Sequence, residues 1–417
     1  MDRYDFPNEP AQNKTRKPVR VSLGVFIISI LLTGILIFSA TFYWMKGYYG
    51  KFTEFEKLNE LVELYEKNYF YDVDREQLSE FLVQAYLYGS GDRFAGYYTA
   101  EEWEEQQFSA SGSSVGIGVY VSGSKNGDLR IAMVMDDSPA EEAGILPGDI
   151  ITAVDGKSMD ELGYEETLNL VKGAEGSSVV LGILRGEETL ALTVVRSKYT
   201  PQTVYAETVI QDGALYGYVR IMEFLSIQTT YYQFRSAVSA LTRAGVQGLI
   251  FDLRDNAGGD LNAILHILDY LLPEGPIVHI FHENEKNPVT YTSDANEIDL
   301  PMVVLANENT ASAAELFTCA LRDYGKAEIV GKKTFGKGCG QSGKQLSDGS
   351  VVFITTFLYN PPYSESYDGI GIFPDYEVDL SEEWRDENLF FVPHDQDDQL
   401  VKAIALITAA AADAQSR

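Results

Sequence analysis

Cysteine and positive charge are both scarce in this sequence of 417 residues, and each scarcity excludes a class of protein. The two cysteines, Cys319 and Cys339, are too few for a disulfide framework; we expect two buried free thiols, with one bridge as the alternative. The 32 lysines and arginines are outnumbered by 62 acidic residues, and the formal net charge is -30. Nucleic-acid phosphates demand basic patches, and no basic cluster follows residue 50. We therefore expect no nucleic-acid partner.

Histidine is also rare, which argues against histidine-based and metal-based catalysis. The four histidines lie outside any recognisable triad motif: His266, His279, His282 and His394. No two of them have the spacing of zinc ligands on a helix, and no Cys-x-x-Cys occurs. We expect no metal site and no other cofactor.

Long hydrophobic runs are absent apart from one near the N-terminus. Residues 21–45 are uncharged and rich in Ile, Leu, Phe and Val, which suffices to cross a hydrocarbon core of about 30 Å. Four basic residues precede the run, and Tyr43 and Trp44 close it. The positive-inside tendency places residues 1–20 in the cytoplasm and residues 46–417 outside. A cleavable signal peptide is the alternative, although the run is longer than a usual signal segment.

Residues 46–112 are predicted to form an acidic helical region. Apolar and aromatic side chains recur there at helical spacing, around 55–65 and again around 78–85. No pattern of catalytic residues is visible. We interpret the region as a packing or dimerisation surface, and a predicted C-terminal helix, 398–412, is a second candidate for contacts within a homodimer.

Residues 113–198 begin with a glycine-rich turn that leads into a strand. A short helix with a serine cap and an early proline follows, and after it comes the stretch Pro-Gly-Asp-Ile. This pattern closely resembles a PDZ domain of the bacterial protease-associated type. The resemblance implies that the N–H groups of Gly116, Ile117 and Gly118 receive a peptide's C-terminal carboxylate, while the peptide adds a strand to the sheet. The alternative is that the glycine-rich segment is only a hairpin turn.

Residues 199–380 contain two turns whose residues are suited to catalysis. A buried strand is predicted over 302–306 and a helix over 316–321, so Ser312 lies where a strand turns into a helix. Backbone N–H groups at the start of a helix are free to face a negative charge. A second strand-to-helix turn, 255–259, contains two adjacent glycines. It suits an oxyanion, and equally a plain turn in which the glycines serve only packing.

A lysine framed by glycines, Lys337, follows Ser312 by about 25 residues, and Gln341 comes four positions later. A serine nucleophile needs a base. Lysine serves as one only when removal from water lowers its pKa from roughly 10.4 toward neutrality. Glu315, one turn after the serine, is expected to cap or pack the helix rather than to act as an acid.

Together these segments resemble the C-terminal processing peptidases, also called tail-specific proteases, over roughly residues 50–410. The motifs that carry the resemblance, in family order, are Asp-Leu-Arg-Asp-Asn-Ala-Gly-Gly at 252–259, Ala-Ser-Ala-Ala-Glu at 311–315, Phe-Gly-Lys-Gly at 335–338 with Gln341, and Gly-Ile-Gly-Ile-Phe-Pro-Asp at 369–375. The sequence departs from the usual motif at Ala257, where relatives usually have proline. Lys172 stands where relatives of the PDZ domain often carry arginine.

The resemblance implies a role for each site residue. Ser312 is the nucleophile, Lys337 is the general base, and Gln341 orients the lysine without adding charge. The oxyanion hole consists of the backbone N–H groups of Gly258 and Ala313, with Gly259 as an alternative to Gly258. A neutral amide suits the position of the glutamine, because a carboxylate there would hold the lysine protonated.

The implied fold class is an α/β (α+β) multidomain protein with a crotonase/ClpP-like protease core at 199–380. It carries the inserted PDZ domain, the N-terminal helical region, one transmembrane helix and a C-terminal helical segment, 381–417. The implied function is an extracytoplasmic serine endopeptidase that cleaves proteins near their C-termini, with the PDZ domain capturing unstructured tails. Two alternatives remain: a catalytically silent PDZ adaptor of the envelope, and a crotonase-like enzyme that processes acyl groups.

Overall fold

The computed structural model describes residues 22–49, 54–123, 128–283, 285–385 and 387–416. The predicted cytoplasmic tail and its basic cluster lie outside the described residues. The chain separates by its internal contacts into two compact units, residues 1–82 and 83–417.

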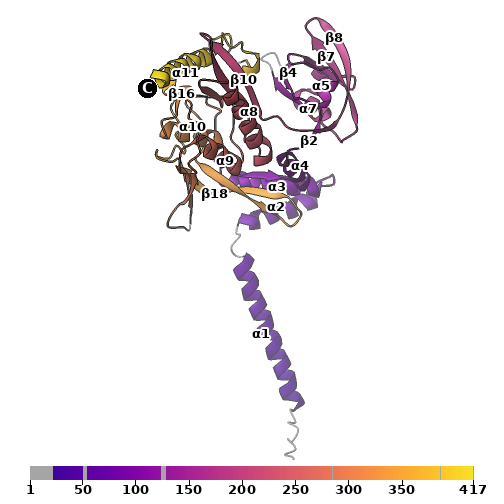
Figure 1. Ribbon diagram of the computed structural model, residues 1–417. Coiled ribbons are helices and arrows are strands. Elements are labelled where there is room, and N and C mark those ends of the chain that lie inside the picture. The colour runs from indigo at the N-terminus through magenta and orange to yellow at the C-terminus, as the bar shows by residue number, and fades with distance from the viewer. Residues whose placement is uncertain (1–21, 50–53, 124–127, 284, 386, 417) are drawn as a thin grey trace, which may run out of the picture. The chain divides into compact units, whose positions relative to one another are not determined.

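The first unit is helical and begins with a long apolar helix, α1 (Leu23–Tyr49) (Figure 1). Its stretch Leu23–Met45 is long and apolar enough to cross a membrane, and its side chains are exposed almost throughout. Helix α2 (Glu54–Asn68) and the first part of α3 (Arg75–Gly89) complete the unit. Apolar side chains of these two helices line a groove of about 550 Å³.

The structure divides the predicted helical region 46–112 differently from the prediction, because its last thirty residues belong to the second unit. Strand β1 (Gly96–Tyr98) pairs antiparallel with β18 (Val351–Asn360). Helix α4 (Ala100–Ala110) follows and begins at a capping box built on Thr99. Pairing with a strand some 250 residues away leaves no mark on local helical periodicity, so the sequence pattern could not reveal it.

A six-stranded sheet forms the centre of the second unit, in the order β10-β11-β12-β15-β16-β19. β10 and β11 pair antiparallel, and the remaining neighbours are parallel. The strands are β10 (Val204–Gln211), β11 (Ala214–Ile221), β12 (Leu249–Asp252), β15 (Met302–Ala306), β16 (Ala327–Gly331) and β19 (Tyr376–Glu377). β15 has the bounds predicted for it and is buried along its whole length, as expected of a parallel strand covered on both faces.

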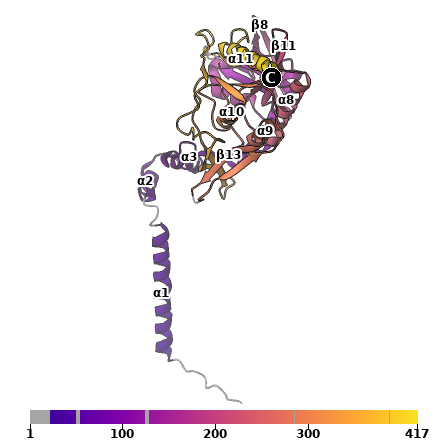
Figure 2. The same cartoon turned by 60° about the vertical axis from the view of Figure 1, so that its left-hand side comes forward.

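Helices cover both faces of this central sheet. Leu249 and Phe251 of β12 point into a core shared with the helices of one face, whereas Ile250 between them packs toward the other face. The first face carries η1 (Ile227–Tyr231, a π-helix), α8 (Tyr232–Arg243), α9 (Leu261–Leu271) and α10 (Ala313–Asp323). The other face carries α11 (Asp398–Ser416), drawn in yellow in Figures 1 and 2.

Helix α11, for which we predicted a dimer contact, turns its apolar face to its own sheet, and a dimer contact through its other face stays a prediction. Its apolar side chains Leu400, Ala403 and Ile407 are fully buried, and they pack on Ile250, Val303 and other residues of its own sheet. The apolar periodicity of residues 398–412 therefore reports packing within the chain. Periodicity shows that one face of a helix is buried but does not identify what covers it.

A second, five-stranded sheet carries the segment after the lysine. It contains β1, β18, β13 and β14 in this order, with β17 pairing to β18. The strands not yet given are β13 (Gly275–His282), β14 (Val289–Ser293) and β17 (Cys339–Gln345). β17 begins two residues after Lys337, so this sheet holds the lysine loop from its C-terminal side.

The PDZ region contains its own sheet, in the order β3-β4-β5-β7-β8, with β6 paired to β5. Its elements are β3 (Val119–Gly123), β4 (Leu129–Val134), α5 (Pro139–Glu142), β5 (Ile150–Val154), β6 (Lys157–Ser158), α6 (Met159–Leu162), α7 (Tyr164–Val171), β7 (Ser178–Arg185) and β8 (Glu188–Val195). Strands β2 (Ser114–Gly116) and β9 (Ser197–Tyr199) pair where the chain enters and leaves this region. A separate hydrophobic core lies between its sheet and helices.

Candidate active site

Ser312 lies directly before α10, at the turn that follows β15. Its backbone has φ 55° and ψ −119°, a conformation that residues other than glycine rarely adopt. Such strain costs on the order of 1–3 kcal/mol and persists only where neighbouring contacts hold it. The side chain is half-buried, so its hydroxyl remains within reach of solvent. A sharp strand-to-helix turn of this kind presents a serine at the edge of a sheet.

The turn after β12 is bound to the turn that carries Ser312. Thr310 Oγ1 donates to the carbonyl of Leu253 at 2.8 Å, and the Ala311 N–H donates to the carbonyl of Asn256 at 2.9 Å. A side chain at Gly258 is excluded, because its Cβ would lie 2.8 Å from the Ser312 Cβ. The glycines at this turn therefore permit the close approach of the two backbones.

The two predicted oxyanion donors differ in availability. The Gly258 N–H donates to the side-chain Oδ1 of Asn256 at 2.8 Å, so this donor is already used. Asn256 is fully buried and its Nδ2 donates to the Ile221 carbonyl, which fixes the amide in place. The Ala313 N–H, by contrast, donates to no residue that the structure describes. The geometry favours Ala313, because Gly258 can contribute only by sharing its hydrogen, and the role of each donor stays a prediction.

Glu315 joins the serine turn to the lysine loop. Its Oε2 accepts hydrogen bonds from the Ser312 N–H at 3.0 Å and from the Lys337 N–H at 2.8 Å. Its Oε1 accepts from the Thr334 hydroxyl and the Gly336 N–H. This carboxylate is fully buried, and burial raises its pKa, while the hydrogen bonds act in the opposite direction. The expectation of a capping role is correct for the Ser312 N–H, and the bonds to the lysine loop go beyond it.

The Lys337 side chain lies in an apolar environment. Its Nζ is 4.7 Å from the centroid of the Phe94 ring. Burial lowers the pKa of Lys337, and the neighbouring Cys339, Asp92 and Glu315 partly raise it. Among the described residues Nζ makes no hydrogen bond or ion pair. A lysine without an anionic partner, with its pKa lowered by burial, is chemically suited to accept a proton.

Gln341 does not reach Lys337 by a hydrogen bond within the described part of the chain. Its Nε2 lies 3.9 Å from the Sγ of Cys339. The pairing of β17 with β18 shifts register between Gly340 and Gln341, which marks a bulge. The role of Gln341 therefore stays a prediction. Cys319 and Cys339 are both free and buried, as we favoured from the sequence.

Tyr359, on β18, is a residue of this site that the sequence analysis missed. Its hydroxyl donates to the carbonyl of Lys337 at 2.8 Å and lies 3.5 Å from the Oγ of Ser312. It is almost completely buried. A tyrosine in a strand with alternating apolar residues has no motif of its own, so only its position in the fold reveals it.

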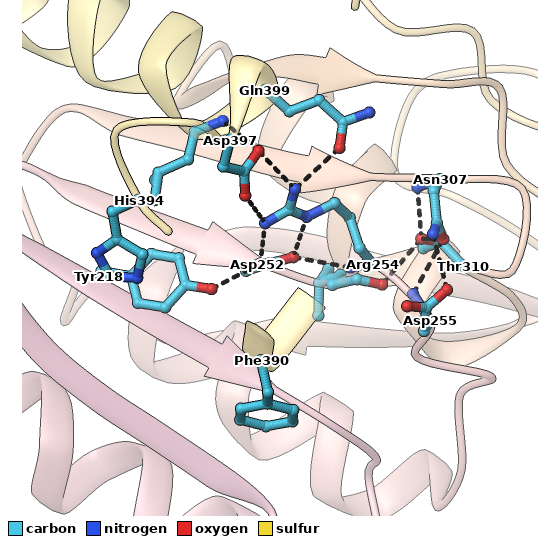
Figure 3. A network of polar contacts seen from close by, with 12 residues as sticks. Tyr218, Asp252, Arg254, Asp255, Asn307, Thr310, Phe390, His394, Asp397 and Gln399 are labelled. Carbon is cyan, nitrogen blue, oxygen red and sulfur yellow. Dashed lines mark hydrogen bonds and ion pairs between the residues drawn. The ribbon is translucent and has the colours of Figure 1, made fainter. Parts of the chain in front are cut away.

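A charged network at the end of β12 fixes the start of the turn at 255–259 (Figure 3). The Arg254 guanidinium forms a bidentate ion pair with Asp252 and binds Asp397 and Gln399, which lie at the start of α11. The Tyr218 hydroxyl donates to Asp252 at 2.7 Å. Burial alone would raise the pKa of Asp252, but Arg254 lowers it to about 2.

The histidines have other partners in the structure. His266 contacts Tyr231, His279 contacts Thr290, His282 packs on an aromatic ring, and His394 lies beside Tyr218. No cluster of three or more histidine, cysteine, aspartate or glutamate side chains able to hold a metal occurs among the described residues.

The predicted peptide-binding turn of the PDZ region precedes β3. The carbonyls of Ile117 and Gly118 accept hydrogen bonds from Ala140 and Met135, which orients the turn. The N–H groups of Ile117 and Gly118 donate to no described residue, whereas Gly116 belongs to β2. β3 is an edge strand with β4 as its only neighbour in the described sheet. An edge strand next to free N–H groups is the arrangement that peptide addition requires.

Fold and site together define a protease core with a serine at a strained turn and a PDZ region. The sequence profile of Peptidase family S41 matches residues 215–378, and the PDZ domain profile matches residues 130–185. The carboxy-terminal processing protease CtpA of Bacillus subtilis is 30% identical over 330 residues, covering 79% of this chain and 70% of the relative. A CtpA-like serine protease of Staphylococcus saprophyticus is 29% identical over 384 residues, covering 89% of this chain and 77% of that protein.

This chain therefore belongs to peptidase family S41, the C-terminal processing peptidases, and is a CtpA-like serine protease. A crystal structure of a Bacteroides fragilis protein assigned to the S41 proteases matches it with a TM-score of 0.54 and 20% identity. That match covers 72% of this chain and 86% of the other, and at this identity it shows the shared fold alone. The expectation of an α/β protease core with a PDZ domain is confirmed.

Proposed function

We propose that the chain is a membrane-anchored endopeptidase that acts outside the cytoplasm and cleaves proteins near their C-termini. Ser312 is the nucleophile and Lys337 the general base. One observation carries this assignment: a single carboxylate oxygen of Glu315 binds the backbone N–H groups of both residues. The nucleophile and the base, 25 positions apart in the sequence, are thereby held side by side.

The chemistry follows from these positions. Ser312 Oγ attacks the scissile carbonyl carbon while its proton passes to the neutral Nζ of Lys337. The developing oxyanion faces the N–H of Ala313 at the start of α10. When the C–N bond breaks, Lys337 returns the proton to the leaving amine, and water then hydrolyses the acyl-enzyme. In this proposal Gln341 turns toward Nζ when substrate is bound, since catalytic hydrogen bonds often form fully only in that complex.

The base assignment is tested with the full chain in detergent micelles and an unstructured protein as substrate. Lys337→Arg is expected to be inactive, because a guanidinium does not deprotonate at working pH. Lys333→Arg, at an exposed lysine of the same loop, is the matched control and should retain activity. Cleavage is followed by intact mass. Near-normal turnover by Lys337→Arg contradicts the assignment.

Ser312→Ala separates the protease from the silent adaptor. We expect wild type to shorten the substrate and Ser312→Ala to leave it intact while still binding tail peptides. If wild type also leaves the substrate intact and both proteins bind tails, the chain is an adaptor. The crotonase-like alternative has no support once the protease family is established.

Capture of tails is assigned to the free N–H groups of Ile117 and Gly118 and to the free edge of β3. A peptide with an apolar C-terminus and a free carboxylate should bind at least about 10-fold more tightly than the same peptide with an amidated end. The reason is that the turn offers N–H donors to a negative charge. Equal affinities, measured by fluorescence polarisation, contradict this mode of binding.

The anchor and the partner assignments rest on the first unit. We assign α1 as an uncleaved single-pass anchor with residues 46–417 outside, which predicts that protease added to intact cells degrades the catalytic region. We assign the groove of α2 and α3 to a second copy of this chain, since Leu61 and Phe81 are more than half exposed there. Leu61→Glu should shift the sedimentation of the detergent-solubilised chain toward monomer, and Glu63→Gln should not.

A further inference from the structure

We propose that Tyr359 is a positioning residue that holds Ser312 and Lys337 in register for the reaction; this rests on the function proposed above. Tyr359 lies on β18, and its own N–H donates to the carbonyl of Gly338 at 3.0 Å. The residue therefore grips the lysine loop twice, through its backbone and through its hydroxyl. Its hydroxyl also lies 3.5 Å from the Oγ of Ser312.

The contacts of the hydroxyl define what it does. A phenol has one hydrogen to donate and lone pairs with which to accept. The 2.8 Å contact to the Lys337 carbonyl takes the hydrogen, which leaves a lone pair facing Ser312 Oγ at 3.5 Å. The serine hydroxyl can donate to that lone pair. Tyr359 thus fixes the rotamer of the nucleophile and the backbone of the base with a single atom.

Tyr359 does not itself act as the base. Burial raises the pKa of its hydroxyl well above the usual range, so the phenol is protonated and neutral at neutral pH. A neutral hydroxyl can orient Ser312 without competing with Lys337 for the proton. Its contribution is geometric, and loss of the hydroxyl should lower the rate of the chemical step and leave substrate binding unchanged.

Tyr367 supplies a matched control. It is equally buried, and its ring packs edge-on against Tyr359 with centroids 6.1 Å apart. Its hydroxyl interacts electrostatically with that of Tyr359, but among the described residues it makes no hydrogen bond to Ser312 or Lys337. Tyr367→Phe and Tyr359→Phe therefore remove the same atom from neighbouring buried rings, and only the second removes a contact to the reacting groups.

The experiment uses the full chain in detergent, a quenched fluorescent peptide with an apolar C-terminus, and a fluorophosphonate that labels reactive serines. Tyr359→Phe should lower kcat about 10- to 100-fold with KM within about twofold, and slow the labelling to a similar extent. Tyr359→His keeps a donor on a ring and should recover part of kcat. Tyr367→Phe should stay within about threefold of wild type.

Two outcomes overturn the proposal and are distinguishable. If Ser312→Ala is inactive but Tyr359→Phe has kcat and labelling within twofold of wild type, the positioning role is wrong and the proposed function stands. If Ser312→Ala remains active, the proposed function fails and the role of Tyr359 fails with it. Equal thermal midpoints of Tyr359→Phe and Tyr367→Phe exclude a difference in folding as the cause.

A different observation concerns the far end of the lysine side chain. We infer that Phe94 shields the Lys337 amine from water and so completes the site from outside the S41-matched residues 215–378. Phe94 precedes β1. Its segment is fixed by pairing of Gly96 with Phe353 and by two 2.8 Å hydrogen bonds that Asp92 accepts from Thr355.

The surroundings of the amine define the test. Phe94, the ring next to the amine, also packs against Phe335 of the lysine loop at 6.4 Å between ring centroids. The charged and titratable groups that face this region are Asp92 and Arg93 on the Phe94 segment, Glu315 on α10 and Cys339 on β17. The ring acts in two ways, by excluding water and through its negative face, which favours the ammonium form. Two substitutions separate these effects.

Phe94→Ala admits water to the amine and should raise the pKa of Lys337. The rise of kcat/KM with pH should then occur at higher pH, and activity at neutral pH should be several-fold lower. Phe94→Leu keeps the apolar cover and should leave this rise in place or move it to lower pH. The rate at which acetic anhydride acetylates Lys337, followed by mass spectrometry across pH, reports the same ordering without relying on activity. Coincident acetylation profiles of wild type and both variants overturn the inference.

Discussion

Asp252, at the end of β12, and Glu315, in the first turn of α10, are both fully buried, but their partners differ in kind. Asp252 faces the Arg254 guanidinium, whereas the donors to Glu315 within the described parts of the chain are backbone N–H groups and a threonine hydroxyl. Burial raises the pKa of a carboxyl. Around Asp252 the arginine reverses this effect and the pKa is about 2, while around Glu315 the pKa stays raised.

The difference shows that one site can contain a region fixed by ion pairs and another ordered by hydrogen bonds from neutral groups. In the Arg254 network one guanidinium binds two carboxylates, Asp252 and Asp397, and so fixes the turn after β12 to α11. The Glu315 network orders the lysine loop with neutral donors that occupy both carboxylate oxygens. No ion pair to Lys337 is formed among the described residues, and such a pair would hold the lysine protonated. The second network therefore positions Lys337, the proposed base, without holding it protonated.

Removal of the Arg254 guanidinium should have the largest effect on stability. Arg254→Met leaves Asp252 and Asp397 as buried carboxylates without the cation that binds them both, and should lower the free energy of unfolding by about 3–5 kcal/mol. Arg385→Met, which removes a half-exposed partner of Asp379, should cost about 0–1 kcal/mol. Urea unfolding of the full chain in detergent measures both. Equal losses of unfolding free energy in the two variants would contradict the stabilising role of the buried Arg254 network.

The second-largest effect on the free energy of unfolding is expected at acid pH, where Asp252 becomes protonated. Its pKa is lowered from 3.8 to about 2, so its stabilisation is complete above the unfolded value and is lost as the pH falls from 3.8 to about 2. The loss should amount to about 2 kcal/mol. It is measured as the slope of the unfolding free energy against pH. Glu382→Gln, which removes an exposed carboxyl, should leave that slope unchanged; a flat profile for wild type contradicts the prediction.

Glu315→Gln should have a smaller effect of opposite pH dependence. The amide cannot accept all four hydrogen bonds, and the loss at neutral pH should be about 1–2 kcal/mol. The raised pKa of Glu315 means that the wild-type advantage is greatest below pH 4.5 and declines as the pH rises through the folded value. Glu383→Gln is the exposed control. An advantage that grows with pH would mean that the four hydrogen bonds outweigh burial and lower the pKa of Glu315.

The sequence predicted the parts of this site that are encoded locally. A short apolar run followed by small residues placed Ser312 between β15 and α10, and the structure has the strand at the predicted bounds. Lys337 was found because glycines frame it and a serine nucleophile needs a base. Capping by Glu315 follows from its spacing of three residues from Ser312. Each of these inferences needed only a few neighbouring residues.

Contacts between distant segments were not predictable in this way. Tyr359 and Phe94 reach the site through β18 and β1, whose pairing leaves no local pattern. Arg254 and Asp397 are 143 positions apart. The spacing of four residues from Lys337 to Gln341 suggested a direct contact, but a β-bulge intervenes and the amide lies beside a cysteine instead.

The sequence alone determined that a serine would stand at a strand-to-helix turn, with a glycine-framed lysine downstream and an apolar helix at the N-terminus, because these features depend on local periodicity and on turn residues. Only the tertiary structure decided that the lysine amine lies against an aromatic ring with no ion pair to a residue the structure describes, and that the Gly258 N–H is already bound. The physical reason is that desolvation and hydrogen-bond competition depend on which distant groups fill the space around a residue. Sequence spacing does not encode that environment.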